Sequence, residues 1–116
     1  MSTRTSTQTM RAVQFATFGG PEVLAPVALP RPEPGPGQVR VLVAVAGVNA
    51  VDGKLRSGAM EQIMPLALPH VPGSEVAGVV TAVGDGAEAE VGDAVFGWAD
   101  TGGYAEQALM STWLAN

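Results

Sequence analysis

The stretch that decides the fold is VAGVNAVDGKLRSG, residues 45–58, where an apolar run gives way to polar side chains. Residues 39–46 are apolar apart from Arg40, which predicts a strand that is buried on both faces. An amide, a carboxylate and two cations follow within eight residues: Asn49, Asp52, Lys54 and Arg56. The chain has no other lysine or arginine after residue 40. The sequence therefore gathers charge at the end of a buried strand.

Residues 49–57 predict a short helix that begins directly after this strand. Asn49 suits the N-cap, Asp52 falls at the third helical position, and Gly58 suits the position after the last turn. Asp52 and Arg56 also have the spacing of an ion pair that stabilises an exposed helix by about 0.3 kcal/mol. Spacing alone favours this structural interpretation, with the two cations on a solvated face, over a binding site.

Short apolar runs separated by glycine and proline predict the other elements. The predicted strands are residues 11–18, 23–29, 39–46, 76–83, 94–98 and 104–110. Pro26 makes the second of these an edge strand. The sequence PRPEPGPG, residues 30–37, predicts an extended connector, and residues 59–73 predict a loop. About six short strands and one helix favour a small β-barrel.

Composition excludes several classes of protein and site. With 116 residues and 47% hydrophobic residues, the chain fits one small domain with a real core. The net charge of −5, and the absence of lysine and arginine from residue 60 onward, argue against nucleic acid or an anionic membrane as partner. The sequence has no run of 18 apolar residues, so it predicts no membrane-spanning helix. The chain has no cysteine, which rules out disulfides and thiolate zinc sites.

The amino-terminal residues 1–9 are polar and predict a disordered extension, with the folded domain beginning at Met10. They lack the apolar segment of a secretory signal, so we expect a cytoplasmic protein.

Three further features have ordinary explanations. GDGAEA, residues 84–89, partly resembles a dinucleotide-binding loop, but no helix is expected after it, so it predicts a hairpin turn. His70 is the only histidine and lies between prolines, which favours a loop residue over a metal ligand. Ser74, in PGSEVAG, lacks the context of a catalytic nucleophile.

Four motifs occur in order: VAGVNAVDGKLRSG, VPGSEVAGVVTAVGDG, EVGDAVFGW and GGYAEQALM. Together, over residues 10–110, they resemble the N-terminal catalytic domain of the medium-chain dehydrogenase/reductase superfamily, most closely its zinc-free quinone oxidoreductases. The resemblance implies a mainly β (α+β) fold, the GroES-like distorted β-barrel with one or two short helices. It assigns residues 10–116 to this alcohol dehydrogenase-type domain and implies that the Rossmann domain that follows in the family is absent from the chain.

The resemblance also implies that the domain holds no metal. Zinc-dependent members of the superfamily take a cysteine and a histidine from this domain. Asn49 and Ser74 stand at those positions here, and neither an amide nor a hydroxyl holds zinc well. The structural zinc lobe of those enzymes would follow Val95, but the chain continues directly to GGYAE.

The implied reaction is hydride transfer from NADPH to a quinone or to an activated carbonyl or alkene. Asn49 and Lys54 are the catalytic residues this resemblance suggests, facing one cleft at the mouth of the barrel. Asn49, Asp52 and Arg56 are the expected cofactor-binding residues. The tyrosine that serves some relatives as proton donor has no counterpart in SGAMEQ, and Tyr104 is expected to be an ordinary strand residue.

The expected partners are a small-molecule substrate and the Rossmann domain. The chain alone is expected to be inactive and not to bind NADPH. Without the Rossmann domain, apolar surface around Trp113 and Leu114 would be exposed to solvent, which favours a homo-oligomer. Two alternatives stay open: a non-catalytic GroES-like structural or interaction module, and a co-chaperonin-like module that uses the apolar loop 59–73.

Overall fold

The computed structural model describes residues 8–115, and in this part of the chain β-strands dominate. Strands β1 and β2 form one antiparallel sheet, and the other five form a second sheet in the order β6-β3-β4-β5-β7. The strands are β1 Thr9–Gln14, β2 Ala25–Pro30, β3 Val39–Ala46, β4 Glu75–Val83, β5 Ala94–Trp98, β6 Gln107–Met110 and β7 Trp113–Ala115. One α-helix, α1 Ala50–Ser57, and one 3-10 turn, η1 Pro21–Val23, complete the fold. The predicted mainly β class is confirmed, although the sheets do not close into a complete barrel.

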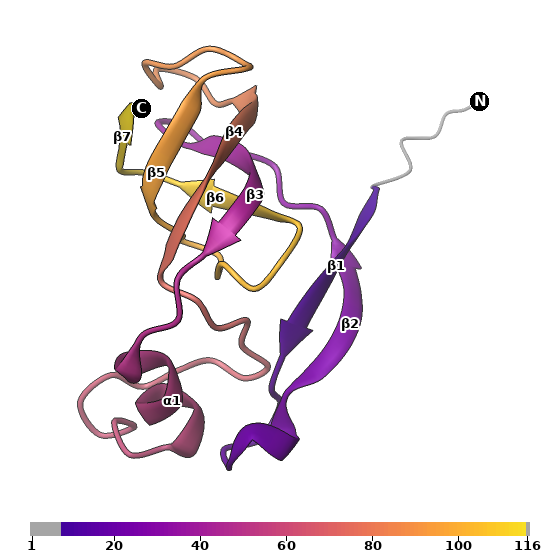
Figure 1. Cartoon of the computed structure of the whole chain (residues 1–116), viewed down its shortest axis with the longest axis vertical. Helices are drawn as coiled ribbons and strands as arrows, with labels where there is room; N and C mark the ends of the chain where they lie inside the picture. Colours follow the sequence, from indigo (N-terminus) through magenta and orange to yellow (C-terminus); the bar gives the residue numbers. More distant parts are fainter. Residues whose placement is uncertain (1–7, 116) are drawn as a thin grey trace.

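The elements lie in three parts of the molecule (Figure 1). The five-stranded sheet occupies one end, α1 and the loop after it occupy the other, and the β1–β2 sheet runs along one side. The register between β3 and β4 shifts twice, between Arg40 and Val41 and between Val43 and Val45. Bulges of this kind bend a strand, and β3 leads from the sheet to the start of α1.

Several strand predictions are confirmed with small changes. Strand β3 has the predicted bounds, β5 does too, and β2 pairs only with β1 and is therefore an edge strand as expected. The strand predicted at residues 104–110 is shorter, because the backbone bends at residues 104 and 106 and Ala105 makes only an isolated bridge, to Ala12. Strand β7 was not predicted, since three residues are too few to show an alternating pattern.

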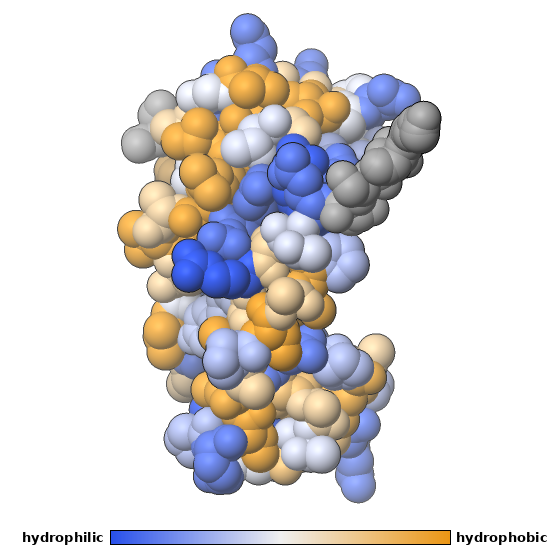
Figure 2. Space-filling model, turned by 90° about the vertical axis from the view of Figure 1, so that its right-hand side faces the viewer, coloured by the Kyte–Doolittle hydropathy of each residue, from blue (hydrophilic) through white to orange (hydrophobic). Residues whose placement is uncertain are grey.

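The hydrophobic core lies on one face of the five-stranded sheet. Its buried members are Val39, Val41, Val76, Val80, Val95 and Met110. Burying a valine side chain of this kind stabilises the fold by roughly 1.5–3 kcal/mol. The prediction that β3 is buried on both faces is wrong, because Leu42 and Val45 are 51% and 64% exposed. Figure 2 shows hydrophobic residues spread over both ends of one side of the molecule.

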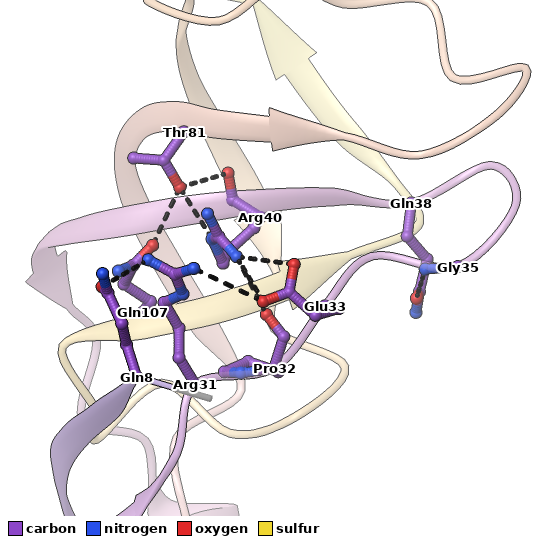
Figure 3. Close-up of polar contacts among 9 residues, drawn as sticks. All are labelled: Gln8, Arg31, Pro32, Glu33, Gly35, Gln38, Arg40, Thr81 and Gln107. Atoms are coloured by element: carbon purple, nitrogen blue, oxygen red, sulfur yellow. Dashed lines mark hydrogen bonds and ion pairs between the residues drawn. The ribbon is translucent and has the colours of Figure 1, made fainter. Parts of the chain in front are cut away.

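A buried arginine fixes the proline-rich connector to the sheet (Figure 3). Arg40 is 6% exposed, and its Nη1 donates to both carboxylate oxygens of Glu33 at 3.0 Å. Its Nε donates to Thr81 Oγ1 at 3.1 Å, and Arg31 Nη2 lies 3.5 Å from Glu33 Oε2. A buried charge is tolerated only when it is paired, and these contacts explain why an arginine occupies a core strand.

The predicted boundary of the amino-terminal extension falls close to the start of β1. That strand begins at Thr9, one residue before the predicted start, and residues 1–7 lie outside the described residues. Among residues 8–115 the only α-helix has eight residues, so none is long enough to cross a membrane.

Candidate functional site

Helix α1 begins and ends at the residues that the sequence predicts. Asn49, the N-cap, has extended backbone angles, and its N–H donates to Asp52 Oδ2 at 3.0 Å. This is one half of a capping box, and it satisfies a donor that the helix leaves without a partner. Gly58 takes the left-handed conformation with φ 86°, which costs a glycine little. The helix start therefore holds Asn49 in a defined position at the end of β3.

Two carboxylates tie the helix start to the beginning of β4. Asn49 Nδ2 donates to Glu75 Oε1 at 2.9 Å, and Ser74 Oγ donates to Asp52 Oδ1 at 3.4 Å. Asp52 is 6% exposed, so its two hydrogen bonds offset the cost of removing it from water. We call these four residues, Asn49, Asp52, Ser74 and Glu75, the Asn49 network. They fix the relative positions of the two segments that carry the predicted site.

A cavity of about 290 Å³ opens beside this network, and we call it the Asn49 cavity. Its lining brings together the three residues predicted to bind cofactor with segments far away in the sequence. The lining residues are Leu24, Val48, Asn49, Ala50, Asp52, Gly53, Arg56, Pro72 and Tyr104. The cavity therefore combines an apolar wall with an amide, a carboxylate, a guanidinium and a phenol.

Lys54 lies outside this cavity. It is exposed and is not among the lining residues. It lies within α1, five positions after Asn49, which is the N-cap and has extended backbone angles. Of the two residues predicted to be catalytic, only Asn49 thus lines the Asn49 cavity, and a cleft shared with Lys54 stays a prediction.

Arg56 is held by the turn that precedes η1. Its Nε donates to the Gly19 carbonyl oxygen at 3.3 Å, and the Gly19 N–H donates back to the Arg56 carbonyl oxygen at 3.0 Å. The predicted ion pair between Asp52 and Arg56 is wrong. The ion pairs found among residues 8–115 are Arg11–Glu106, Arg31–Glu33 and Arg40–Glu33. Arg56 thus connects the helix to the segment that leads through η1 to Leu24, another lining residue of the Asn49 cavity.

Asp52 also lines a second cavity of about 340 Å³, together with His70, Ser74 and Trp98. Burial lowers the pKa of His70, and the negative charge of Asp52 opposes this effect. On the other side, burial raises the pKa of Tyr104, the charge of Asp52 adds to the increase, and Arg56 works against it. One buried carboxylate thus influences an ionisable ring in each cavity.

The sequence interpretation missed Tyr104 as a site residue. It lies before β6 and not within a strand, and it reaches the Asn49 cavity from a segment 55 positions after Asn49. The available signal was that the only tyrosine of the chain follows the turn-forming pair Gly102-Gly103.

The donor set of the network does not suit zinc. Asn49 and Ser74 offer an amide and a hydroxyl, which are poor zinc ligands, and both side chains already bond to carboxylates. Within residues 8–115 no group of three histidine or acidic side chains has a metal-binding arrangement.

Comparison with known proteins identifies the fold family. The family model described as the alcohol dehydrogenase GroES-like domain matches residues 35–115. This chain belongs to that family. The human quinone oxidoreductase is 48% identical to this GroES-like domain over 112 residues, covering 92% of the chain and 33% of that protein. These matches place the domain in the medium-chain dehydrogenase/reductase superfamily, as the resemblance predicted.

Solved structures agree with this assignment. Human synaptic vesicle membrane protein VAT-1 homolog-like protein has a TM-score of 0.87 with the GroES-like domain at 32% identity, covering 93% of this chain and 35% of that chain. A mycobacterial protein solved in complex with NADPH has a TM-score of 0.77 at 38% identity, with 88% and 30% coverage. The chain thus spans about a third of the length of the relatives it matches.

Proposed function

We propose that this GroES-like domain forms one wall of the active site of an NADPH-dependent oxidoreductase of the quinone oxidoreductase type. The substrate would be a quinone or an activated carbonyl or alkene. The Asn49 cavity is the observation that carries the proposal, because it gathers Asn49, Asp52 and Arg56 at one opening. The identity to quinone oxidoreductases and the likeness to a protein solved with NADPH support it.

The cavity is too small for a whole cofactor. Its volume of about 290 Å³ suits a single ring system, and its lining mixes apolar walls with a few polar groups, as ligand pockets do. The turn after β4, which resembled a dinucleotide-binding loop, leads to β5 and not to a helix. We therefore infer that the adenosine half and the pyrophosphate are bound by a Rossmann domain beyond this chain.

Each residue of the cavity has a role in this proposal. Bound NADPH would supply the hydride. Asn49 keeps one amide hydrogen beyond the one given to Glu75, and it can donate to the nicotinamide ribose or to the substrate. Arg56 contributes positive charge beside developing negative charge. Asp52 positions both Asn49 and Ser74. Lys54 is left out of the cavity chemistry because it does not line the cavity.

The same proposal includes independence from zinc. By resemblance, Asn49 and Ser74 stand at the positions of the two ligands that zinc-dependent members of the superfamily take from this domain. Both side chains are committed to carboxylates, and the sequence has no cysteine that could supply a thiolate ligand. Elemental analysis of the purified full-length gene product should find no stoichiometric zinc, and finding it would overturn this part.

The test of the function is NADPH consumption by the full-length gene product. We expect oxidation of NADPH when a benzoquinone or a simple enone is added, and no oxidation with either reagent alone. A full-length protein that binds NADPH but reduces none of these acceptors would contradict the assigned substrate class. A full-length protein that does not bind NADPH would contradict the proposal as a whole.

A non-catalytic interaction module is the second candidate, and one observation favours it. The loop after α1 exposes apolar side chains, with Ile63 77% and Met64 46% exposed. Apolar loop residues of this kind often mark protein contacts. Binding of NADPH distinguishes the candidates, because an interaction module without turnover has no need of the cofactor. The cytoplasmic location and the homo-oligomer stay predictions.

A further inference from the structure

Tyr104 is placed in the Asn49 cavity by two other segments of the chain. Its N–H donates to the Pro72 carbonyl oxygen at 3.0 Å, and its own carbonyl oxygen accepts the Val13 N–H at 2.8 Å. The ring lies against Gly73, where an added Cβ would be 2.8 Å from Tyr104 Cδ1. The backbone and one side of the ring are therefore fixed before any ligand arrives, as a preorganised binding group requires.

The phenol is a hydrogen-bond donor that the protein leaves available. In the same cavity, Asn49 Nδ2 already bonds to Glu75, and Arg56 Nε already bonds to Gly19. Among residues 8–115, no hydrogen bond engages the Tyr104 hydroxyl. Tyr104 lines the Asn49 cavity, and the charges of Asp52 and Arg56, which line it as well, act on the phenol, so the hydroxyl is in position to bind an oxygen atom of a ligand there.

We propose that the Tyr104 hydroxyl donates a hydrogen bond to the carbonyl oxygen of the substrate in the Asn49 cavity. This inference rests on the proposed function and names the group that binds the reacting oxygen. When the acceptor gains a hydride from NADPH, the electron pair of its double bond moves toward this oxygen, which becomes an oxyanion. Tyr104 keeps its proton and stabilises that charge, and water supplies the proton that completes the product.

The surroundings of Tyr104 favour a donor over a base. Burial raises the pKa of the phenol above its ordinary value of 10.0, and the nearby charge of Asp52 raises it further. Arg56 acts in the opposite direction with a smaller effect. The phenol therefore stays protonated over the whole neutral range, as a hydrogen-bond donor to an oxyanion must.

The first experiment compares Tyr104→Phe with a matched loss of a hydroxyl in the full-length gene product. Removing one donor from an oxyanion site lowers kcat by about 100-fold or more, so Tyr104→Phe should reduce kcat with little change in KM for NADPH. The control is Thr101→Val, which removes a hydroxyl from the same segment. Thr101 Oγ1 accepts the Leu109 N–H at 3.0 Å and does not line the cavity, so kcat should be unchanged.

The outcomes separate this inference from the proposed function. If the wild-type protein reduces quinones or enones and Tyr104→Phe does so at the same kcat, the inference is wrong and the function stands. If the wild-type protein reduces no acceptor, the proposed function fails and Tyr104 has no reaction to assist. If Thr101→Val lowers kcat as much as Tyr104→Phe, the effect belongs to the segment and the inference is also wrong.

The second experiment needs no activity, because Tyr104 is the only tyrosine of the chain. Its ionisation can be followed by the ultraviolet absorbance of tyrosinate in the 116-residue chain. We expect a midpoint above 10.0, and a lower midpoint in Asp52→Asn, because that variant removes the negative charge beside the phenol. A wild-type midpoint at or below 10.0, or one that Asp52→Asn leaves unchanged, would overturn the placement of the phenol beside Asp52.

Discussion

Asn49 and Glu75 join the end of β3 to the start of β4 through a single side-chain hydrogen bond, with Asn49 Nδ2 2.9 Å from Glu75 Oε1. The adjacent backbone adds a second connection, because the Gly47 N–H donates to the Glu75 carbonyl oxygen at 2.8 Å. Together with the bond from the Asn49 N–H to Asp52, this leaves the amide group little freedom. The amide is thus oriented by the protein before any ligand binds.

Replacing Asn49 should affect turnover more than stability. Asn49→Ala should cost about 1 kcal/mol of stability through the lost helix cap and lower kcat of the full-length gene product by about 10-fold or more. Asn49→Ser is the matched variant, since serine caps helices well but is too short to replace the amide. It should keep the melting temperature and lose activity. If Asn49→Ser keeps full activity, Asn49 is only a cap.

Asp52 should matter for folding, because it is buried and supports two other residues. Asp52→Ala should lower the free energy of unfolding by about 2 kcal/mol, through the lost capping bond and the unsatisfied Ser74 hydroxyl. Asp52→Asn keeps an acceptor and should lose less. Urea unfolding measures the effect, with Glu61→Ala as an exposed control that should change stability by less than about 0.5 kcal/mol. Equal stability of Asp52→Ala and Glu61→Ala would contradict the structural role.

Gly78 should tolerate no side chain. A Cβ at this position would collide with the Leu42 carbonyl oxygen and lie 2.8 Å from Val41 Cγ1. Since the obstacle is the backbone of β3, Gly78→Ala should destabilise the domain by about 1–3 kcal/mol. Gly35→Ala is the control, because its Cβ would have only Gln38 Oε1 nearby, at 3.5 Å. Thermal unfolding of both variants measures the difference. A Gly78→Ala variant as stable as Gly35→Ala would contradict the close contact between Gly78 and the backbone of β3.

His70 should make stability fall in mild acid. Burial lowers its pKa below the ordinary value of 6.5, so the unfolded chain binds a proton before the folded chain does. The stability that comes from a neutral His70 is complete above 6.5 and is lost as the pH falls through the lower, folded pKa. Unfolding measured from about pH 8 to about pH 5 should show this loss in the wild type and less of it in His70→Gln. Identical slopes in the two proteins would disprove it.

The 116-residue chain alone should not bind NADPH measurably. Immobilising a ligand costs about 4 kcal/mol or more, and the described part of the chain provides the Asn49 cavity but no glycine-rich loop that opens a helix. Calorimetric titration of the chain should show no binding under conditions in which the full-length gene product binds. A micromolar dissociation constant for the chain would mean that the cofactor site lies within it.

Local features of the sequence were sufficient to predict β3 and α1. Three residues defined the helix, because Asn49, Asp52 and Gly58 each act on the backbone within one turn. The exposure of Leu42 and Val45 could not be predicted in the same way, since an apolar run does not say which of its faces has a covering layer. The sequence thus predicted the class and order of the elements better than it predicted which side chains are buried.

The composition of the site depended on tertiary contacts. Leu24, Pro72 and Tyr104 reach the Asn49 cavity from three separate segments, and nothing in the local sequence of α1 indicates them. The spacing of the two cations does not separate their positions either. Arg56 lines the cavity and Lys54 is exposed outside it, although both follow Asn49 within eight residues.

The attachment of β1 to the rest of the molecule has a consequence for folding during synthesis. The β1–β2 sheet is connected through Val13 to Tyr104, through Ala12 to Ala105, and through Arg11 to Glu106, so every one of these partners lies about 90 positions later in the chain. Contacts of such long sequence separation form slowly, because a large loop must close first. As the chain leaves the ribosome, the connection between β1 and β2 meets its partners first, since Gly19 bonds to Arg56 and Phe15 to His70, whereas β1 itself stays without its partners at residues 104–106 until nearly the whole domain has emerged.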